Sequence, residues 1–152
     1  MIIAAIGAPG PVDLERLKAE GWKGLEGRGF TGQLGTIWRR GEGADLTVGF
    51  LSEARHCNEN AGVVHGGALM TFADIGLGFG VARSLGHSSC VTAHLQINFL
   101  SAGPVGSFIH VKPEVVRKGA QLVFVRGVIM AGDKAVASAD GIWKVLASKW
   151  PE

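Results

Sequence analysis

Residues 66–84 constrain the fold most, because this segment has the length of a helix and is apolar nearly all round. The wider stretch 61–82 is apolar enough to be weighed as a membrane span. It contains His65 and Asp74, however, and no basic or aromatic belt flanks it. A charge near the bilayer centre costs about 2.5–3.5 kcal/mol. We therefore expect a core helix that is buried on most sides.

Alternating segments on both sides of this helix predict an antiparallel sheet. Residues 91–100 read VTAHLQINFL, which places Leu95, Ile97 and Phe99 on one face. Further strands are expected at residues 34–40, 45–51, 107–117, 122–130 and 135–146. The breaks between the later strands are hairpin-sized, and such breaks join antiparallel neighbours. The pattern predicts an α+β domain, with an antiparallel sheet of about five to six strands wrapped around one central helix.

The chain has 152 residues, fits one domain, and contains no linker or internal repeat that would indicate a second. Residues 11–21 predict a short surface helix, with Pro and Asp at its start and Gly at its end. We therefore expect a single domain over residues 1–152, in which residues 1–30 form a helical N-terminal extension. The first residues lack the basic region of a signal peptide. With only two cysteines, the chain is expected to be cytoplasmic.

The distribution of charge and of potential ligands excludes several functions. The net charge is +2 and the basic residues are scattered singly, which disfavours nucleic-acid binding. The residues His56, Cys57, Cys90 and His94 have no zinc-site spacing, so we expect no metal. The sequence also contains no G-x-S-x-G motif of the serine hydrolases.

Asp74 is the only charged side chain between His65 and Arg83. An ionised carboxylate inside a buried helix is costly unless it is hydrogen-bonded or reaches a cavity. This residue type at this position points to acid–base chemistry. The alternative is a structural aspartate tied to a neighbouring backbone group or arginine.

His65, Gly66 and Gly67 stand where a polar loop meets the expected helix. The first N–H groups of a helix have no intrahelical partner, and two glycines allow a ligand to approach them closely. Such donors stabilise a carbonyl oxygen on which negative charge develops. The plainer alternatives are a tight turn at the two glycines and a core histidine.

The spacing of these two features predicts an oligomer. Gly66 and Asp74 are eight residues apart, which is about 12 Å along one helix. A carboxylate at that distance does not easily reach a carbonyl held at the start of the same helix. If both groups act on one substrate, they come from different subunits, which predicts a dimer. We therefore expect self-association, as a homodimer or as a homotetramer that is a dimer of dimers.

The segment HCNENAGVVHGGALMTFADIGLG, followed by VTAHLQINFLSAGPVG, resembles the hotdog-fold acyl-CoA thioesterases of the phenylacetate-degradation (PaaI-like) type. Their signature is approximately Asn-x-x-Gly-x-x-His-Gly-Gly, with an Asp nine residues after the His and later a hydroxyl residue and a Pro-Gly turn. The resemblance covers roughly residues 34–146. It implies the hotdog fold and hydrolysis of acyl-CoA thioesters to a carboxylic acid and free coenzyme A. It implies no cofactor other than the coenzyme A of the substrate.

The resemblance also implies roles for individual residues. Asp74 matches the catalytic carboxylate, acting as general base or as nucleophile. Gly66 matches the residue whose backbone N–H polarises the thioester carbonyl, and His65 lines the same place. Thr92 stands where relatives often have a Ser or Thr that holds the water or the carboxylate. Parity places Thr92 on the polar face of its strand, away from the helix, unless the strand is bulged.

Two further groups of residues follow from the same resemblance. Counting back from His65, the family asparagine position falls on Glu59, between Asn58 and Asn60. We favour Asn58 as the catalytic asparagine and expect Asn60 and Gly67 to contact the substrate, although asparagine is also common in plain turns.

The segment Arg117, Lys118 and Gly119 forms a basic turn that could meet the coenzyme A phosphates. Basic hairpin turns are also ordinary solvated surface.

The sequence is also compatible with two other functions. One is a non-catalytic hotdog module that binds acyl-CoA or a fatty acid, and the other is a hotdog hydratase or dehydratase. The sequence does not choose between aromatic and aliphatic acyl groups, or between dimer and tetramer.

Overall fold

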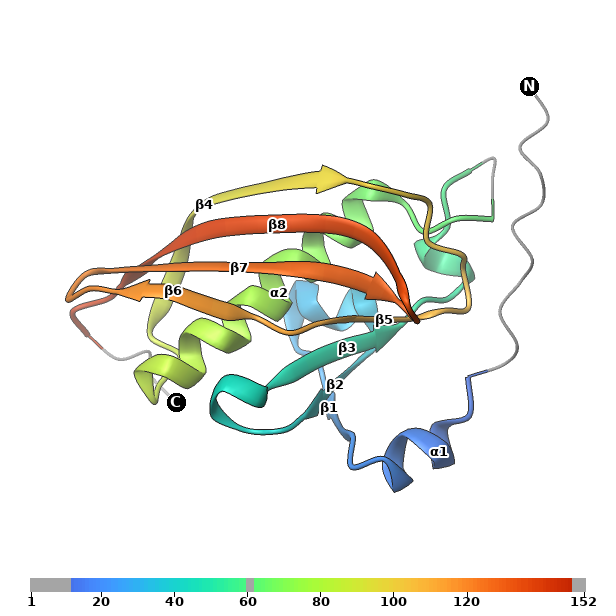
Figure 1. Cartoon of the computed structure of the whole chain (residues 1–152), viewed down its shortest axis with the longest axis horizontal. Coiled ribbons are helices and arrows are strands. Elements are labelled where there is room, and N and C mark those ends of the chain that lie inside the picture. The colour runs from blue at the N-terminus through green and yellow to red at the C-terminus, as the bar shows by residue number, and fades with distance from the viewer. Residues whose placement is uncertain (1–11, 60–61, 149–152) are drawn as a thin grey trace.

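The computed structural model describes residues 12–59 and 62–148, in which one curved antiparallel sheet wraps around a long helix, α2 (Gly66–Leu85) (Figure 1). The strands are β1 (Lys23–Glu26), β2 (Thr36–Arg40), β3 (Thr47–Leu51), β4 (Cys90–Phe99), β5 (Phe108–Val111), β6 (Glu114–Lys118), β7 (Leu122–Ala131) and β8 (Lys134–Val145). Their order in the sheet is β1-β2-β3-β5-β7-β8-β4, and β6 also pairs with β7. The predicted α+β arrangement with a single central helix is confirmed.

The sheet has eight strands, so the expected five to six was too low. The segment predicted as one strand over residues 107–117 is two strands, β5 and β6, separated by Lys112 and Pro113. Both pair with β7, at different ends of it. Proline cannot donate a hydrogen bond to a strand ladder, which explains the break. Strand β1 was missed because it is only four residues long and fully exposed, with no alternating pattern.

The core lies between α2 and the concave face of the sheet. Phe72, Leu77 and Val81 of the helix are completely buried, together with Phe50 and Ile129 of the sheet. By length and composition α2 is also the one candidate membrane span in the described part of the chain. In the fold it serves as the core helix, as predicted.

Glycines allow α2 to lie unusually close to the sheet. A Cβ atom on Gly76 would lie 2.6 Å from a methyl group of Val111, and one on Gly80 would lie 2.5 Å from the ring of Pro113. On the sheet side, a Cβ on Gly127 would lie 2.6 Å from Val111. Part of the high glycine content therefore has a packing role at the helix–sheet contact.

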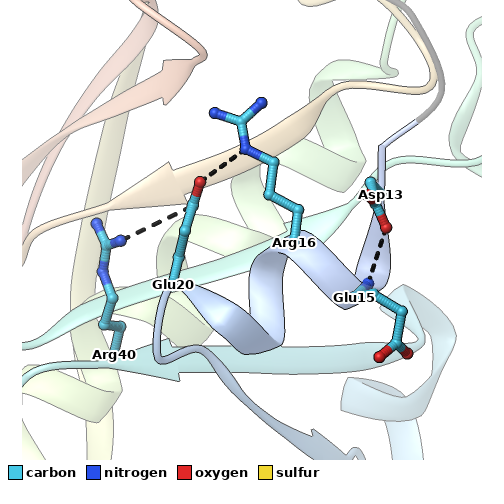
Figure 2. A network of polar contacts seen from close by, with 5 residues as sticks. All are labelled: Asp13, Glu15, Arg16, Glu20 and Arg40. Carbon is cyan, nitrogen blue, oxygen red and sulfur yellow. Dashed lines mark hydrogen bonds and ion pairs between the residues drawn. The ribbon is translucent and has the colours of Figure 1, made fainter.

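The N-terminal helix α1 (Leu14–Ala19) packs at the edge of the domain. Asp13 caps it by accepting from the Glu15 N–H at 3.0 Å, and Glu20 pairs with Arg16 at 2.8 Å and with Arg40 at 4.0 Å (Figure 2).

Of the expected helical extension over residues 1–30, the structure describes residues 12–30, and this part is only partly helical. It contains the short helix α1, but also strand β1 and the start of the 3-10 helix Gly29–Leu34. Residues 1–11 lie outside the described part of the chain. The buried Leu17 joins α1 to a small second cluster with Trp22 and Trp38.

Candidate functional site

Asp74 lies in the middle of α2, and its carboxylate accepts a short hydrogen bond of 2.6 Å from the hydroxyl of Thr92 on β4. The side chain is half-buried rather than enclosed. The helix, which we expected to be buried on most sides, is open to solvent at this position. A hydroxyl that donates to one carboxylate oxygen fixes the side chain while the other oxygen remains available.

A β-bulge brings Thr92 to this position. Thr92 pairs with Trp143 of β8 and His94 pairs with Ile142, so Ala93 is an extra residue in β4. An extra residue reverses the alternation of side chains, so Thr92 points toward α2 whereas His94 points away from it. Parity alone would place the Thr92 side chain away from the helix. The bulge turns it toward α2 instead.

Asp74 and Thr92 open into a hollow of about 450 Å³ between α2 and the start of β4. Its lining is mostly apolar or small and consists of Thr31, Asp74, Ile75, Gly78, Phe79, Ala82, Ser88, Cys90, Val91, Thr92 and Trp143. Burial raises the pKa of the Cys90 thiol, which keeps it protonated and makes it a poor nucleophile. Among the residues that line this hollow, Asp74 carries the only charged side chain.

The N-terminus of α2 presents one free backbone donor. The N–H of Gly67 donates to Nδ1 of His65 at 2.8 Å, and the N–H groups of Ala68 and Leu69 donate to the His65 carbonyl at 2.9 and 3.1 Å. The Gly66 N–H has no hydrogen bond to any residue that the structure describes. It is therefore the donor available to a ligand, as an oxyanion site requires.

These contacts give His65 and Gly67 definite local roles. His65 is the N-cap of α2, with its ring folded over Gly67. A Cβ atom on Gly67 would lie 3.0 Å from His65 Nδ1, so glycine leaves room for the cap. Because its N–H is already engaged, Gly67 has no backbone donor to offer a substrate in this geometry.

Gly66 and Asp74 do not share a hollow within one chain. Gly66 lines a separate space of about 270 Å³ at the other end of β4, next to Phe99 and Leu100. The fold thus separates the free N–H from the carboxylate.

The loop before α2 is described only in part. Asn58 is exposed, and its backbone N–H donates to the carbonyl of Val63 at 2.8 Å, which closes the loop near His65. Asn60 lies outside the described residues, so the choice between the two asparagines stays a prediction.

His56 is buried and has both ring nitrogens engaged, with the Glu53 N–H and the Gln33 carbonyl. It is a structural histidine and offers no base to its neighbour Cys57.

The basic segment Arg117–Gly119 ends β6 beside the C-terminus of α2 (Figure 1). The ammonium of Lys118 donates to the carbonyl of Ser84 at 2.7 Å, which caps the helix C-terminus. Arg117 is exposed, and the Gly119 N–H donates to the Leu122 carbonyl at 2.8 Å. Of the three residues, Arg117 has the side chain most available to an anion.

A larger hollow, of about 1020 Å³, lies on the outer face of the sheet and includes His94, Arg126 and Asp140. Side chains on this face point away from α2, so this space is separated by the sheet from Asp74. Among the described residues, no three His, Cys, Asp or Glu side chains gather where they could hold a metal ion.

The chain belongs to the thioesterase superfamily, whose family model matches residues 61–138. It is 34% identical over 99 residues to PA0474 of Pseudomonas aeruginosa, a protein provisionally named an esterase, and the match covers 64% of this chain and 73% of that one. Family membership and the eight-stranded sheet around one helix confirm the hotdog fold. They also support the predicted class, a thioester hydrolase.

Solved structures agree with this assignment. The conserved protein PA5202 of Pseudomonas aeruginosa has a TM-score of 0.69 and 25% identity, over 80% of this chain and 96% of that one. BH2602 of Bacillus halodurans, solved with CoA, has a TM-score of 0.60 and 27% identity, over 66% of each chain. PaaI of Escherichia coli has a TM-score of 0.62 over 89% of this chain and 86% of that one, at 18% identity. That likeness shows the fold alone, so the PaaI-like subtype stays a prediction.

Proposed function

We propose that this protein hydrolyses acyl-CoA thioesters, with Asp74 as the catalytic carboxylate and the backbone N–H of Gly66 as the oxyanion donor. The observation that carries the proposal is the half-buried Asp74 carboxylate, held by Thr92 at 2.6 Å on the edge of an apolar hollow. A CoA complex of a similar protein, BH2602, supports coenzyme A as the carrier. The proposed reaction uses no metal and no cofactor beyond the coenzyme A of the substrate.

The chemistry follows from these two groups. As general base, the Asp74 carboxylate takes a proton from water while the water oxygen bonds to the thioester carbon. The carbonyl electrons move to its oxygen, which the Gly66 N–H stabilises. Collapse of this intermediate breaks the C–S bond, and the coenzyme A thiolate leaves with the proton as a thiol. In the alternative, the Asp74 carboxylate itself attacks the thioester carbon, the C–S bond breaks and the coenzyme A thiolate leaves. Water then hydrolyses the mixed anhydride, which releases the carboxylic acid and restores the Asp74 carboxylate.

A complete site requires a second copy of the chain, because Asp74 and Gly66 open into different hollows. Strand β4 supplies the natural contact, since it is a ten-residue strand at the edge of the sheet. Its last residue, Phe99, and the next residue, Leu100, have exposed apolar side chains that are 56% and 55% accessible. Long unpaired edges of this kind invite pairing with another strand.

Antiparallel pairing of two β4 strands would join the two half-sites. Thr92, which holds Asp74, stands near one end of β4, and Phe99, whose ring lies next to Gly66, stands at the other. These positions are seven residues apart, about 23 Å along a strand. A two-fold axis between Leu95 and Gln96 therefore places each Asp74 close to Gly66 of the partner subunit.

We propose supporting roles for three further residues. His65 holds the helix N-terminus that carries the donor. Asn58 lies in the loop that leads to it. The exposed Arg117 is proposed to bind a phosphate of coenzyme A.

Release of free thiol from a panel of aromatic and aliphatic acyl-CoAs tests the proposed function. We expect turnover of at least one member of the panel, with the acid and coenzyme A formed in equal amounts. Tight binding of acyl-CoA without thiol release would instead identify a non-catalytic binding module. Consumption of an enoyl-CoA without thiol release would identify a hydratase.

Replacing Thr92 tests how the carboxylate is held. Thr92→Val keeps the shape of the side chain but removes the hydrogen bond to Asp74. Hydrogen bonds to charged groups contribute about 1.5–3 kcal/mol, so we expect kcat to fall roughly 10- to 100-fold. Thr92→Ser retains the hydroxyl and serves as the control, with kcat close to wild type. Equal rates for the Val and Ser variants would remove Thr92 from the site.

The oligomeric state can be measured by light scattering. We expect a mass that is twice or four times the 15.9 kDa of the chain, because pairing through β4 gives a dimer and the family arrangement allows a dimer of dimers. An active protein that scatters as a single chain at assay concentration would contradict the shared site.

A further inference from the structure

Trp143 carries a polar atom that the fold itself does not use. The residue is only 3% exposed, and it belongs to the core between α2 and the sheet. A buried tryptophan normally donates its indole N–H to an acceptor. Within the described part of the chain, however, the Trp143 Nε1 makes no hydrogen bond.

The indole nitrogen reaches the hollow that contains Asp74. Among the described residues, every fully enclosed side-chain nitrogen or oxygen has a hydrogen-bond partner. Since the Trp143 Nε1 has none, it is not enclosed, and Trp143 lines the hollow beside Asp74 and Gly78. A Cβ atom built on Gly78 would lie 3.6 Å from this nitrogen, which places Nε1 against the open surface of the helix.

The position of this donor relative to the reacting carbonyl is fixed by the helix and the strand pairing. Gly78 follows Asp74 by four residues, which is about 6 Å along α2 on the same face. Trp143 is also the cross-strand partner of Thr92, which holds the Asp74 carboxylate. The indole N–H therefore stands roughly one helical turn from the point at which the thioester carbon is attacked.

We propose that Trp143 is a substrate-binding residue of the thioesterase site, donating its indole N–H to a substrate oxygen about one helical turn from the thioester carbonyl. This inference rests on the proposed function. The recognised group is a neutral carbonyl or hydroxyl oxygen, because the indole N–H is an uncharged single donor. It belongs either to the acyl chain, as a keto or hydroxyl group, or to the first amide of the pantetheine arm.

Two pairs of thioesters distinguish these sources in steady-state kinetics of the wild type and Trp143→Phe. The first pair is butanoyl-CoA and 3-hydroxybutanoyl-CoA, which differ by one oxygen on the acyl chain. The second is the butanoyl thioesters of N-acetylcysteamine and of ethanethiol, of which only the first has the amide. We expect Trp143→Phe to lower kcat/KM roughly three- to tenfold for the member that carries the recognised oxygen, which is the usual worth of a neutral hydrogen bond. The other member of that pair should be unaffected.

Two control variants separate recognition from packing. Phe79→Leu alters an apolar wall of the same hollow and should change both members of each pair by the same factor. Gly78→Ala places a methyl group in van der Waals contact with Nε1, favours the helix, and should reproduce the loss seen with Trp143→Phe. If Trp143→Phe does not fold, Gly78→Ala alone tests whether the indole N–H binds the substrate.

The outcomes separate this inference from the proposed function. Thiol release by the wild type, with neither Trp143→Phe nor Gly78→Ala changing the ratio within either pair, overturns the role of Trp143 alone. Absence of thiol release from every thioester by the wild type overturns the proposed function, and the role of Trp143 with it.

Discussion

Asp74→Asn is expected to lower the rate of acyl-CoA hydrolysis by about three orders of magnitude, within the range of roughly 10²–10⁴ for a lost general base. The amide has the shape of the carboxylate, and its oxygen can still accept the hydroxyl of Thr92. The fold should therefore persist while the proton acceptor is lost. Thiol release at saturating substrate measures the effect, and circular dichroism verifies the fold.

Asp140→Asn is the matched control for this substitution. Asp140 is exposed and accepts from Gln96 at 2.9 Å on the outer face of the sheet, away from α2. Its replacement should leave kcat unchanged. If Asp74→Asn retained the activity of the Asp140→Asn control, Asp74 would not be the catalytic carboxylate.

Gly66→Pro is expected to lower kcat roughly 10²- to 10³-fold, the usual loss when one oxyanion donor is removed. Gly66 is the first residue of α2, where proline is favoured and its missing N–H breaks no helical hydrogen bond. The preceding residue, His65, has φ −60° and ψ 137°, a conformation that proline permits in its predecessor. The substitution thus removes the donor and little else.

Gly66→Ala separates the donor from the added bulk. A Cβ atom at this position would lie 3.3 Å from the ring of Phe99, which is 56% exposed in the single chain, so only a small shift is needed. The alanine variant keeps the N–H, so its kcat should stay within a few-fold of wild type. Equal losses for the proline and alanine variants would point to a steric effect and remove the oxyanion role from Gly66.

The central helix and most of the sheet could be predicted because their patterns are local. The apolar run that ends near Leu85 needs no partner to be recognised, and the alternation in residues 91–100 is typical of a strand. Asp74 and Gly66 are predicted as site residues because one charge and one pair of glycines stand out in that run.

Features that depend on register could not be predicted in this way. The bulge at Ala93 turns Thr92 toward Asp74, but it is defined only by the pairing of β4 with β8. The same pairing brings Trp143 into the hollow, and nothing in the local sequence marks it as a site residue. Pro113, which separates β5 from β6, indicates a break in the strand. The alternation of the residues around it nevertheless predicts one continuous strand.

The central claim is that each site combines Asp74 of one subunit with Gly66 of the partner subunit. Co-expression of Asp74→Asn and Gly66→Pro chains tests it directly, because a mixed dimer carries one site with both intact groups and one site with neither. Half of randomly formed dimers are mixed, so we predict recovery of about one quarter of wild-type thiol release from two nearly inactive chains. Activity no higher than the sum of the two variants alone, in a preparation shown to contain mixed dimers, would contradict the shared site.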